Sequence, residues 1–250
     1  MNEQSPLFRP ADKPEKPVTA RPPDRPVASR WRRRLAILAV IAIAVLVCYL
    51  ARGPLLRAAA SLLISEDPGE SADFVLPLGK AREFAESAEV RRSGRAADVL
   101  LIPTKPKYAQ RLGILPTDEE LLVRELKRAG IADRTAPAIL SPVGNDWARF
   151  RLLGAWMAQH PGARVEIVCG RFQSARCRHI LRAVLPKEAA ARVLILALAR
   201  PEYDETNWWN RKEGVLDVCN SAVSYAYVFF CGEDEEKPEW DPDQYEKTLR

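Results

Sequence analysis

Basic and amide side chains gather in turns that each follow a short apolar run of the sequence. The residues expected to form one site there are Gly79, Lys80, Lys105, Asn145, Arg171, Gln173 and Arg176. Lysine and arginine side chains, together with the N–H groups at helix N-termini, suit a phosphate or carboxylate ligand. Because a single cation in a loop is usually only solvated, the prediction of an anion-binding site depends on the cluster.

Carboxylates in the same turns could take part in a reaction. Asp146, Glu202 and Asp204 could each supply an acid or base to a hydrolase or transferase whose basic side chains stabilise developing charge. The sequence lacks the motifs of phosphate-binding loops, nucleophile elbows and zinc proteases. With His160 and His179 as its only histidines, it also excludes a histidine-rich metal centre, and we predict no metal and no cofactor.

The turns separate apolar runs and helical patterns that alternate regularly. Strands are predicted at 74–78, 99–103, 138–140, 165–169 and 193–198, and helices at 81–93, 117–130, 146–159, 174–185 and 211–230. Apolar strands separated by single helices indicate a mostly parallel sheet that is covered on both faces. We therefore predict a doubly wound, five-stranded Rossmann-like α/β domain with its ligand site at the carboxyl ends of the strands.

An uncharged apolar run of 17 residues, 35–51, directly follows four arginines that end at Arg34. This length is at the short end of what crosses a bilayer core of ~30 Å. The positive-inside rule predicts a cytoplasmic N-terminus and an extracytoplasmic main domain. A cleaved signal peptide and a buried helix of a soluble protein are the alternatives. The 34 residues before the run and its lack of a polar face argue against them.

Composition divides the chain into five parts. We predict a disordered cytoplasmic arm (1–34), a transmembrane helix (35–51), a juxtamembrane helix and linker (52–71), the α/β domain (72–231) and an acidic tail (232–250). The arm holds nine basic and four acidic residues, which accounts for the net charge of +5, so the charge does not indicate nucleic-acid binding. The predicted partner is instead the lipid bilayer, and the predicted location is the inner membrane with a periplasmic domain.

Four cysteines follow the apolar run. In an oxidising compartment Cys169 could pair with Cys177, or Cys219 with Cys231, although spacing alone fixes no connectivity. Cys169 lies inside an apolar strand pattern, where a buried free thiol is the more common state.

Several segments carry a resemblance to a known family. They are the N-terminal apolar run, the lead-in LLRAAASLLISEDP from Leu55, the first strand ending in Leu78 and Gly79, the stretch VEIVCGRFQSARCRHILRAVLP from Val165, and NWWN from Asn207. In these segments the chain resembles the YdcF/SanA/ElyC-like envelope proteins. The resemblance implies a membrane-anchored extracytoplasmic domain of cell-envelope biogenesis, with a lipid-linked glycan or peptidoglycan precursor as its ligand.

The chain also departs from this family. Family members have glycine-rich turns after the first two strands, where this chain has Gly79-Lys80 and a turn from Pro103 to Pro106. Gln173 stands where relatives have a histidine, although Arg176 matches a retained arginine. These departures favour binding of an anionic, phosphate-bearing precursor over catalysis. A hydrolase or transferase of such a precursor is the first alternative, and a scaffold that docks a protein partner through Trp208 and Trp209 is the second.

Overall fold

The computed structural model describes residues 27–67, 69–131 and 138–233. They belong to two compact units, and the boundary between these units along the chain lies between Ala51 and Arg52. Helix α1, Val27–Ser61, contains the whole predicted apolar run, and the side chains at 33–47 are exposed. Most of the predicted N-terminal arm and acidic tail lies outside the described residues. A separate helix after residue 51 is not found, because α1 continues past Pro54 to Ser61.

Two parts of the described chain meet the length and hydropathy needed to cross a membrane. Helix α8, Lys212–Cys231, meets them by itself, whereas Arg33–Val47 and Ala51–Ser61 meet them only when they are counted together as one broken span. Length and composition alone do not assign a membrane location, so the predicted transmembrane run at 35–51 stays a prediction.

The second unit is built around a five-stranded parallel sheet. Its strands are β1 (Ala72–Pro77), β2 (Ala96–Leu101), β3 (Ala138–Ile139), β4 (Val165–Gly170) and β5 (Val193–Leu198). They lie in the order β3-β2-β1-β4-β5, and every neighbouring pair is parallel. The prediction of a parallel Rossmann-like sheet is confirmed, and the strand order reverses between β1 and β4.

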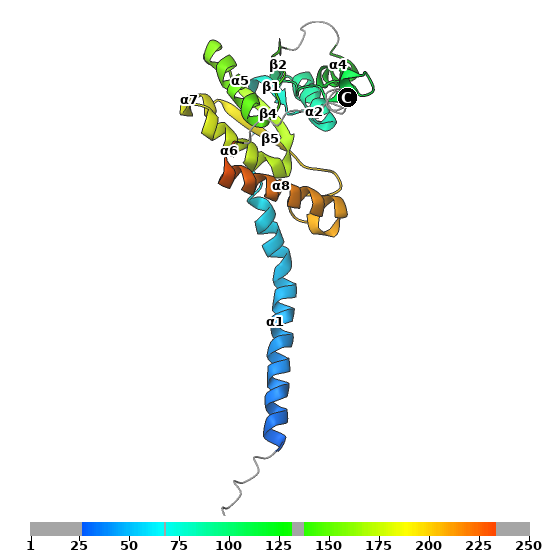
Figure 1. The fold of residues 1–250 in the computed structure, drawn as a ribbon, viewed down its shortest axis with the longest axis vertical. Coiled ribbons are helices and arrows are strands. Elements are labelled where there is room, and N and C mark those ends of the chain that lie inside the picture. Colours follow the sequence, from blue (N-terminus) through cyan, green and yellow to red (C-terminus); the bar gives the residue numbers. More distant parts are fainter. Residues whose placement is uncertain (1–26, 68, 132–137, 234–250) are drawn as a thin grey trace, which may run out of the picture. The chain divides into compact units, whose positions relative to one another are not determined.

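Helices cover both faces of the sheet (Figure 1). The helices of this unit after α1 are α2 (Ala81–Arg92), α3 (Tyr108–Arg111), α4 (Asp118–Arg128), α5 (Asp146–Gln159), α6 (Ser174–Val184), α7 (Lys187–Ala190) and α8, with short 3-10 turns η1 (Arg171–Gln173) and η2 (Trp208–Asn210). One apolar core joins the sheet to α5 and α6, and a second joins it to α2 and α4. The domain is therefore wound on both faces.

Local sequence signals explain where several helices begin and which face they bury. Thr117 Oγ1 accepts a hydrogen bond from Glu120 N at 3.3 Å and Glu120 Oε2 accepts one from Thr117 N at 2.9 Å, which form a capping box at the start of α4. On α5 the stripe of Phe150, Leu153 and Met157, at helical spacing, is fully buried. Both helices are thus fixed by short-range patterns.

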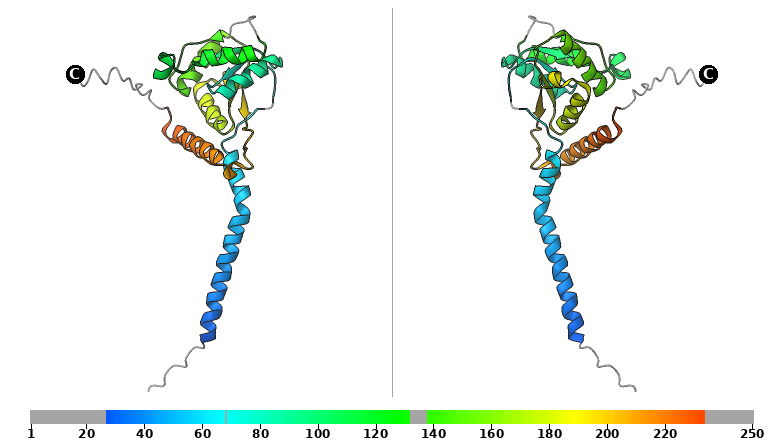
Figure 2. Two further views of the ribbon diagram at one scale, coloured as in Figure 1. Left: turned by 90° about the vertical axis from the view of Figure 1, so that its right-hand side faces the viewer. Right: turned by 90° about the vertical axis from the view of Figure 1, so that its left-hand side faces the viewer.

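A third apolar cluster lies outside the two faces of the sheet. It consists of Ala60, Leu63, Phe172, Tyr203, Trp208 and Val218. Figure 2 shows the end of α1 beside the start of α8, which this cluster joins. Asp67 continues the attachment, because its N–H donates to Ile195 O at 3.1 Å and its carboxylate accepts from Ile195 N at 2.7 Å. Part of the segment 56–67 is therefore packed against the domain, through Ala60, Leu63 and Asp67.

Candidate functional site

A cavity of about 230 Å³ opens at the carboxyl ends of β1, β4 and β5. Its walls are the N-cap and first turn of α2 (80–83), the segment 170–173 at the end of β4, Leu198 at the end of β5, Arg200 and Tyr203 in the loop after it, and Asp217 of α8. Because β1 and β4 are the strands between which the order reverses, the cavity lies at the switch point of the sheet. This is the edge at which the sequence predicts the ligand site.

Lys80 and Gln173 converge on Gly170 at one wall of this cavity. A Cβ atom at Gly170 would lie 3.7 Å from Gln173 Oε1 and 3.8 Å from Lys80 Nζ, so both side chains lie over this glycine. Lys80 is also the N-cap residue of α2, and its backbone oxygen accepts hydrogen bonds from Glu83 N and Phe84 N. Two residues of the predicted cluster, Lys80 and Gln173, therefore meet over Gly170, next to the start of α2.

Glu83 contributes a buried carboxyl group to the same cavity. The residue is 2% exposed, and its Oε2 atom accepts a hydrogen bond from Lys80 N at 2.9 Å. Burial raises the pKa of Glu83 above its ordinary value, while the Lys80 N–H, the Lys80 ammonium and Arg149 act in the opposite direction. The cavity thus holds an acid whose proton is retained to higher pH than in solution.

Tyr203, Asp217 and Arg200 form another part of the cavity wall. Tyr203 donates its hydroxyl proton to Asp217 Oδ2 at 3.0 Å, and Arg200 Nε lies 3.6 Å from the same oxygen. Burial and the neighbouring Asp217 carboxylate raise the pKa of Tyr203 to about 12. The phenol is therefore a stable hydrogen-bond donor at neutral pH rather than a base.

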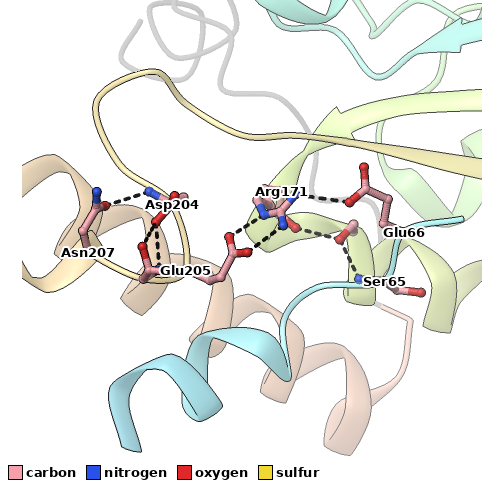
Figure 3. A network of polar contacts seen from close by, with 8 residues as sticks. Ser65, Glu66, Arg171, Asp204, Glu205 and Asn207 are labelled. Carbon is pink, nitrogen blue, oxygen red and sulfur yellow. Dashed lines mark hydrogen bonds and ion pairs between the residues drawn. The ribbon is translucent and has the colours of Figure 1, made fainter. Parts of the chain in front are cut away.

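Arg171 is held by carboxylates of the protein, as Figure 3 shows. Its Nε and Nη2 atoms donate to the two oxygens of Glu205 at 2.7 and 2.8 Å, and Nη1 lies 3.2 Å from Glu66 Oε2. The hydrogen bonds to Glu205 raise the pKa of Arg171 further. This arginine lines the cavity, but its donors are directed to the protein, which reduces its capacity to bind an anion.

Arg176 and Asp146 are brought together as an ion pair. Asp146 also accepts a hydrogen bond from Arg149 Nη1 at 2.9 Å, and Arg149 donates to Leu78 O at 3.0 Å. The charges of the predicted ligand arginine and of the predicted catalytic carboxylate therefore largely neutralise each other. Neither residue lines the cavity.

Lys105 and Asn145 lie in turns that belong to a different part of the same edge. Asn145 is the N-cap of α5, where its Oδ1 atom accepts from Ala148 N at 2.8 Å. The turn that holds Lys105 is fixed by backbone bonding, since Lys105 N donates to Val143 O at 2.9 Å. Neither residue lines the cavity, so the structure separates the predicted cluster into two groups.

Gly79 and Asp204 each contribute to a local turn of the backbone. Gly79 adopts a φ of 114°, which favours glycine, in the turn between β1 and α2. Asp204 accepts hydrogen bonds from Thr206 Oγ1 at 2.6 Å and Thr206 N at 2.8 Å, and these bonds lower the pKa of Asp204. Asp204 therefore closes a local turn and does not line the cavity.

Glu83 and Asp217 line the cavity but are not among the residues that the sequence predicts for the site. Glu83 has a readable signal, because it stands three residues after Lys80, at the capping-box position of a helix that follows the first strand. Asp217 has none, since it lies on α8 and only the packing of that helix brings it to the strand ends. Among the described residues no group of three or more metal-binding side chains is found.

The chain matches no protein-family model, no curated protein and no solved structure. Its resemblance to the YdcF/SanA/ElyC-like envelope proteins therefore stays a hypothesis that rests on its sequence segments.

Proposed function

We propose that the chain is a single-pass membrane protein of the cell envelope whose α/β domain binds the anionic, phosphate-bearing group of an envelope precursor. The anchor in this proposal is the apolar run 35–51, with the arginine-rich arm in the cytoplasm and the α/β domain in the periplasm. The binding site is the cavity at the ends of β1, β4 and β5.

The observation that carries the binding proposal is the position of Lys80. Its Nζ atom lies beside Gln173 over Gly170, at the N-terminus of a 12-residue helix and at the switch point of the sheet. The Lys80 ammonium and the Gln173 amide can both donate to an anion, and Lys80 is the N-cap of α2, whose dipole is positive at this end. Gln173 and Tyr203 add neutral polar groups that can orient a ligand.

The size of the cavity bears on which part of a ligand it would take. At about 230 Å³ it is smaller than the ~300–1,000 Å³ typical of pockets that enclose a whole drug-sized ligand. A phosphate with part of an attached sugar is a closer fit than a complete lipid-linked glycan. The proposal therefore assigns the head group to the cavity and leaves the lipid chain in the bilayer.

The two alternatives gain no support from the geometry. Asp146 and Asp204 both accept hydrogen bonds from neighbouring groups of the protein, and neither carboxylate lines the cavity. Trp208 is 7% exposed in the third apolar cluster, where its Nε1 atom donates to Leu56 O at 3.3 Å, so its ring is core rather than a docking surface.

Native mass spectrometry of the full-length protein extracted from membranes tests this proposal. We expect wild-type protein to carry a polyprenyl phosphate, and Lys80→Ala to lose most of it. Lys187→Ala is the matched control, because Lys187 is an exposed lysine at the start of α7 that lines no part of this cavity. A second variant, Lys105→Ala/Arg176→Ala, reports on the remaining predicted cluster.

Each result has a defined meaning. Loss in Lys80→Ala with retention in the other two variants supports the cavity as the site. Loss only in Lys105→Ala/Arg176→Ala would move the site to the other part of the edge. A wild-type protein that is inserted and folded, but binds neither polyprenyl phosphate nor inorganic phosphate when these are added, would contradict the proposal.

A further inference from the structure

Helix α8 presents an apolar stripe that no described part of the chain covers. Leu216, Val223 and Phe230 recur every seventh residue and are 52%, 71% and 81% exposed. Residues at this spacing lie on one side of an α-helix. From residue 218 to the end of α8 at Cys231 the helix contains no charged residue.

The other side of α8 is buried against the domain. Gly214, Val218, Ser221 and Val228 are all buried, and Val218 belongs to the third apolar cluster. A helix that is apolar on opposite sides needs cover on both. The domain covers one side only, so the exposed stripe is a surface for something else.

The third apolar cluster holds α8 close in space to the residues that follow the proposed anchor. Trp208, just before α8, donates its Nε1 proton to Leu56 O at 3.3 Å. Leu56 comes five residues after Ala51, the end of the apolar run, and five residues of chain span at most about 18 Å. Leu55 and Leu62, beside this contact, are themselves 65% and 74% exposed. A bilayer that holds the anchor therefore lies within reach of α8.

Charges at the start of α8 suit an anionic membrane surface. Arg57, Arg211 and Lys212 are exposed, as is Glu213, and the half-buried Asp204 interacts electrostatically with Arg57. An apolar helical face bordered by cations is typical of helices that lie in the interface of anionic bilayers.

We propose that α8 lies along the bilayer surface with Leu216, Val223 and Phe230 in the boundary between head groups and acyl chains. This inference rests on the proposed anchor at 35–51. Helices of this kind insert their apolar face about 5–10 Å. Because Asp217 of the same helix lines the cavity, this arrangement brings the candidate site to the level of lipid head groups.

Depth-dependent quenching in the full-length protein tests this placement. Cys48, Cys219 and Cys231 are replaced by alanine, and an environment-sensitive fluorophore is attached to Val223→Cys. Ile114→Cys is the matched control, since Ile114 is an exposed apolar residue (69%) away from α8. Ile41→Cys reports on the anchor. Each protein is placed in nanodiscs of phosphatidylcholine and phosphatidylglycerol whose acyl chains carry a spin label near the head group or near the methyl end.

We expect the probe at position 223 to lose emission with the shallow spin label and much less with the deep one. The probe at position 114 should keep its emission, and the probe at position 41 should lose emission with the deep label. An unquenched probe at 223 beside a quenched probe at 41 would overturn the inference while leaving the anchor intact. Blue-shifted but unquenched emission at 223 would also overturn it and indicate a protein cover, such as a second copy.

Two further outcomes are decisive. Stronger quenching at 223 by the deep label would mean that α8 crosses the membrane, which contradicts an interfacial helix. An unquenched probe at 41 would remove the proposed anchor, and the inference with it.

Discussion

Asp146 at the first turn of α5 and Arg176 on α6 form an ion pair that ties two helices of the same layer together. The second oxygen of Asp146 binds Arg149, which in turn donates to Leu78 O at the end of β1. Asp146 is therefore the carboxylate that neutralises two guanidinium groups beside the sheet edge. Its main role is to fix the loops around the site.

Replacing this carboxylate should destabilise the fold. Asp146→Asn leaves Arg149, whose side chain is only 3% exposed, without its ionic partner. Breaking such a buried pair costs about 3 kcal/mol. Urea unfolding monitored by circular dichroism measures the change in the free energy of unfolding.

The control for Asp146→Asn is Arg176→Met, which keeps the buried Arg149 pair intact. Arg176 is 25% exposed, so its loss should cost only about 1 kcal/mol. An Asp146→Asn protein as stable as wild type would show that the ion pairs are not structural, and would restore Asp146 as a candidate for chemistry.

Glu83 should give the domain a distinct pH dependence. Burial raises the pKa of Glu83 above 4.5, so the folded state binds this proton more tightly than the unfolded state. The stability that Glu83 contributes is complete below pH 4.5 and is lost as pH rises through the raised pKa. Glu83→Gln removes this loss, so its stability relative to wild type should increase as pH rises from 4 to 7 in chemical unfolding experiments.

Glu89→Gln, on the same helix, is the matched comparison, and its stability relative to wild type should change with pH in the opposite direction. The hydrogen bond from Arg92 lowers the pKa of Glu89, so this carboxylate contributes stability above pH 4.5. Its replacement should therefore lower stability relative to wild type as pH rises. Equal pH profiles for the two variants would contradict the environment described for Glu83.

Gly214 allows α8 to pack against η2. A Cβ atom at this position would lie 2.4 Å from the backbone oxygen of Trp208, closer than packed atoms approach. Gly214→Ala should therefore cost about 1–3 kcal/mol through forced displacement. Gly154→Ala on α5 is the control, because its nearest atom, Leu185 Cγ, would be 3.7 Å away. There the gain in helix propensity should stabilise by about 0.5–1 kcal/mol. Thermal unfolding measures the stability of both variants. Equal changes in stability for Gly214→Ala and Gly154→Ala would contradict this account.

Those parts of the fold that depend on neighbouring residues could be predicted from the sequence. The capping box of Thr117 and Glu120, the buried stripe of α5 and the alternation of strands with helices all rest on spacings of a few residues. The edge at which the cavity lies followed from the parallel arrangement. Lys80 and Gln173 can be identified in this way, because each lies in the turn that follows a strand.

Long-range pairings could not be predicted in the same way. Glu205 and Glu66 lie 34 and 105 residues from Arg171, so only the finished fold reveals that they bind it. The packing of Ala60 and Leu63 in one cluster with Val218 of α8 could not be predicted either, because an apolar pattern suits a bilayer and a protein core equally well and no local pattern specifies the position of α8.

The cysteines provide a test of the core at β4 and α6. Cys169 and Cys177 are buried free thiols, whereas Cys231 is exposed at the end of α8. The neighbouring Cys177 side chain and burial raise the pKa of Cys169 well above its ordinary value, which further suppresses its thiolate. In a Cys48→Ala background, maleimide should modify Cys231 in the folded protein, and peptide mapping should show Cys169 and Cys177 modified only after unfolding. If both stay unmodified in denaturant until a reductant is added, they form a disulfide, which would contradict the free thiols described here.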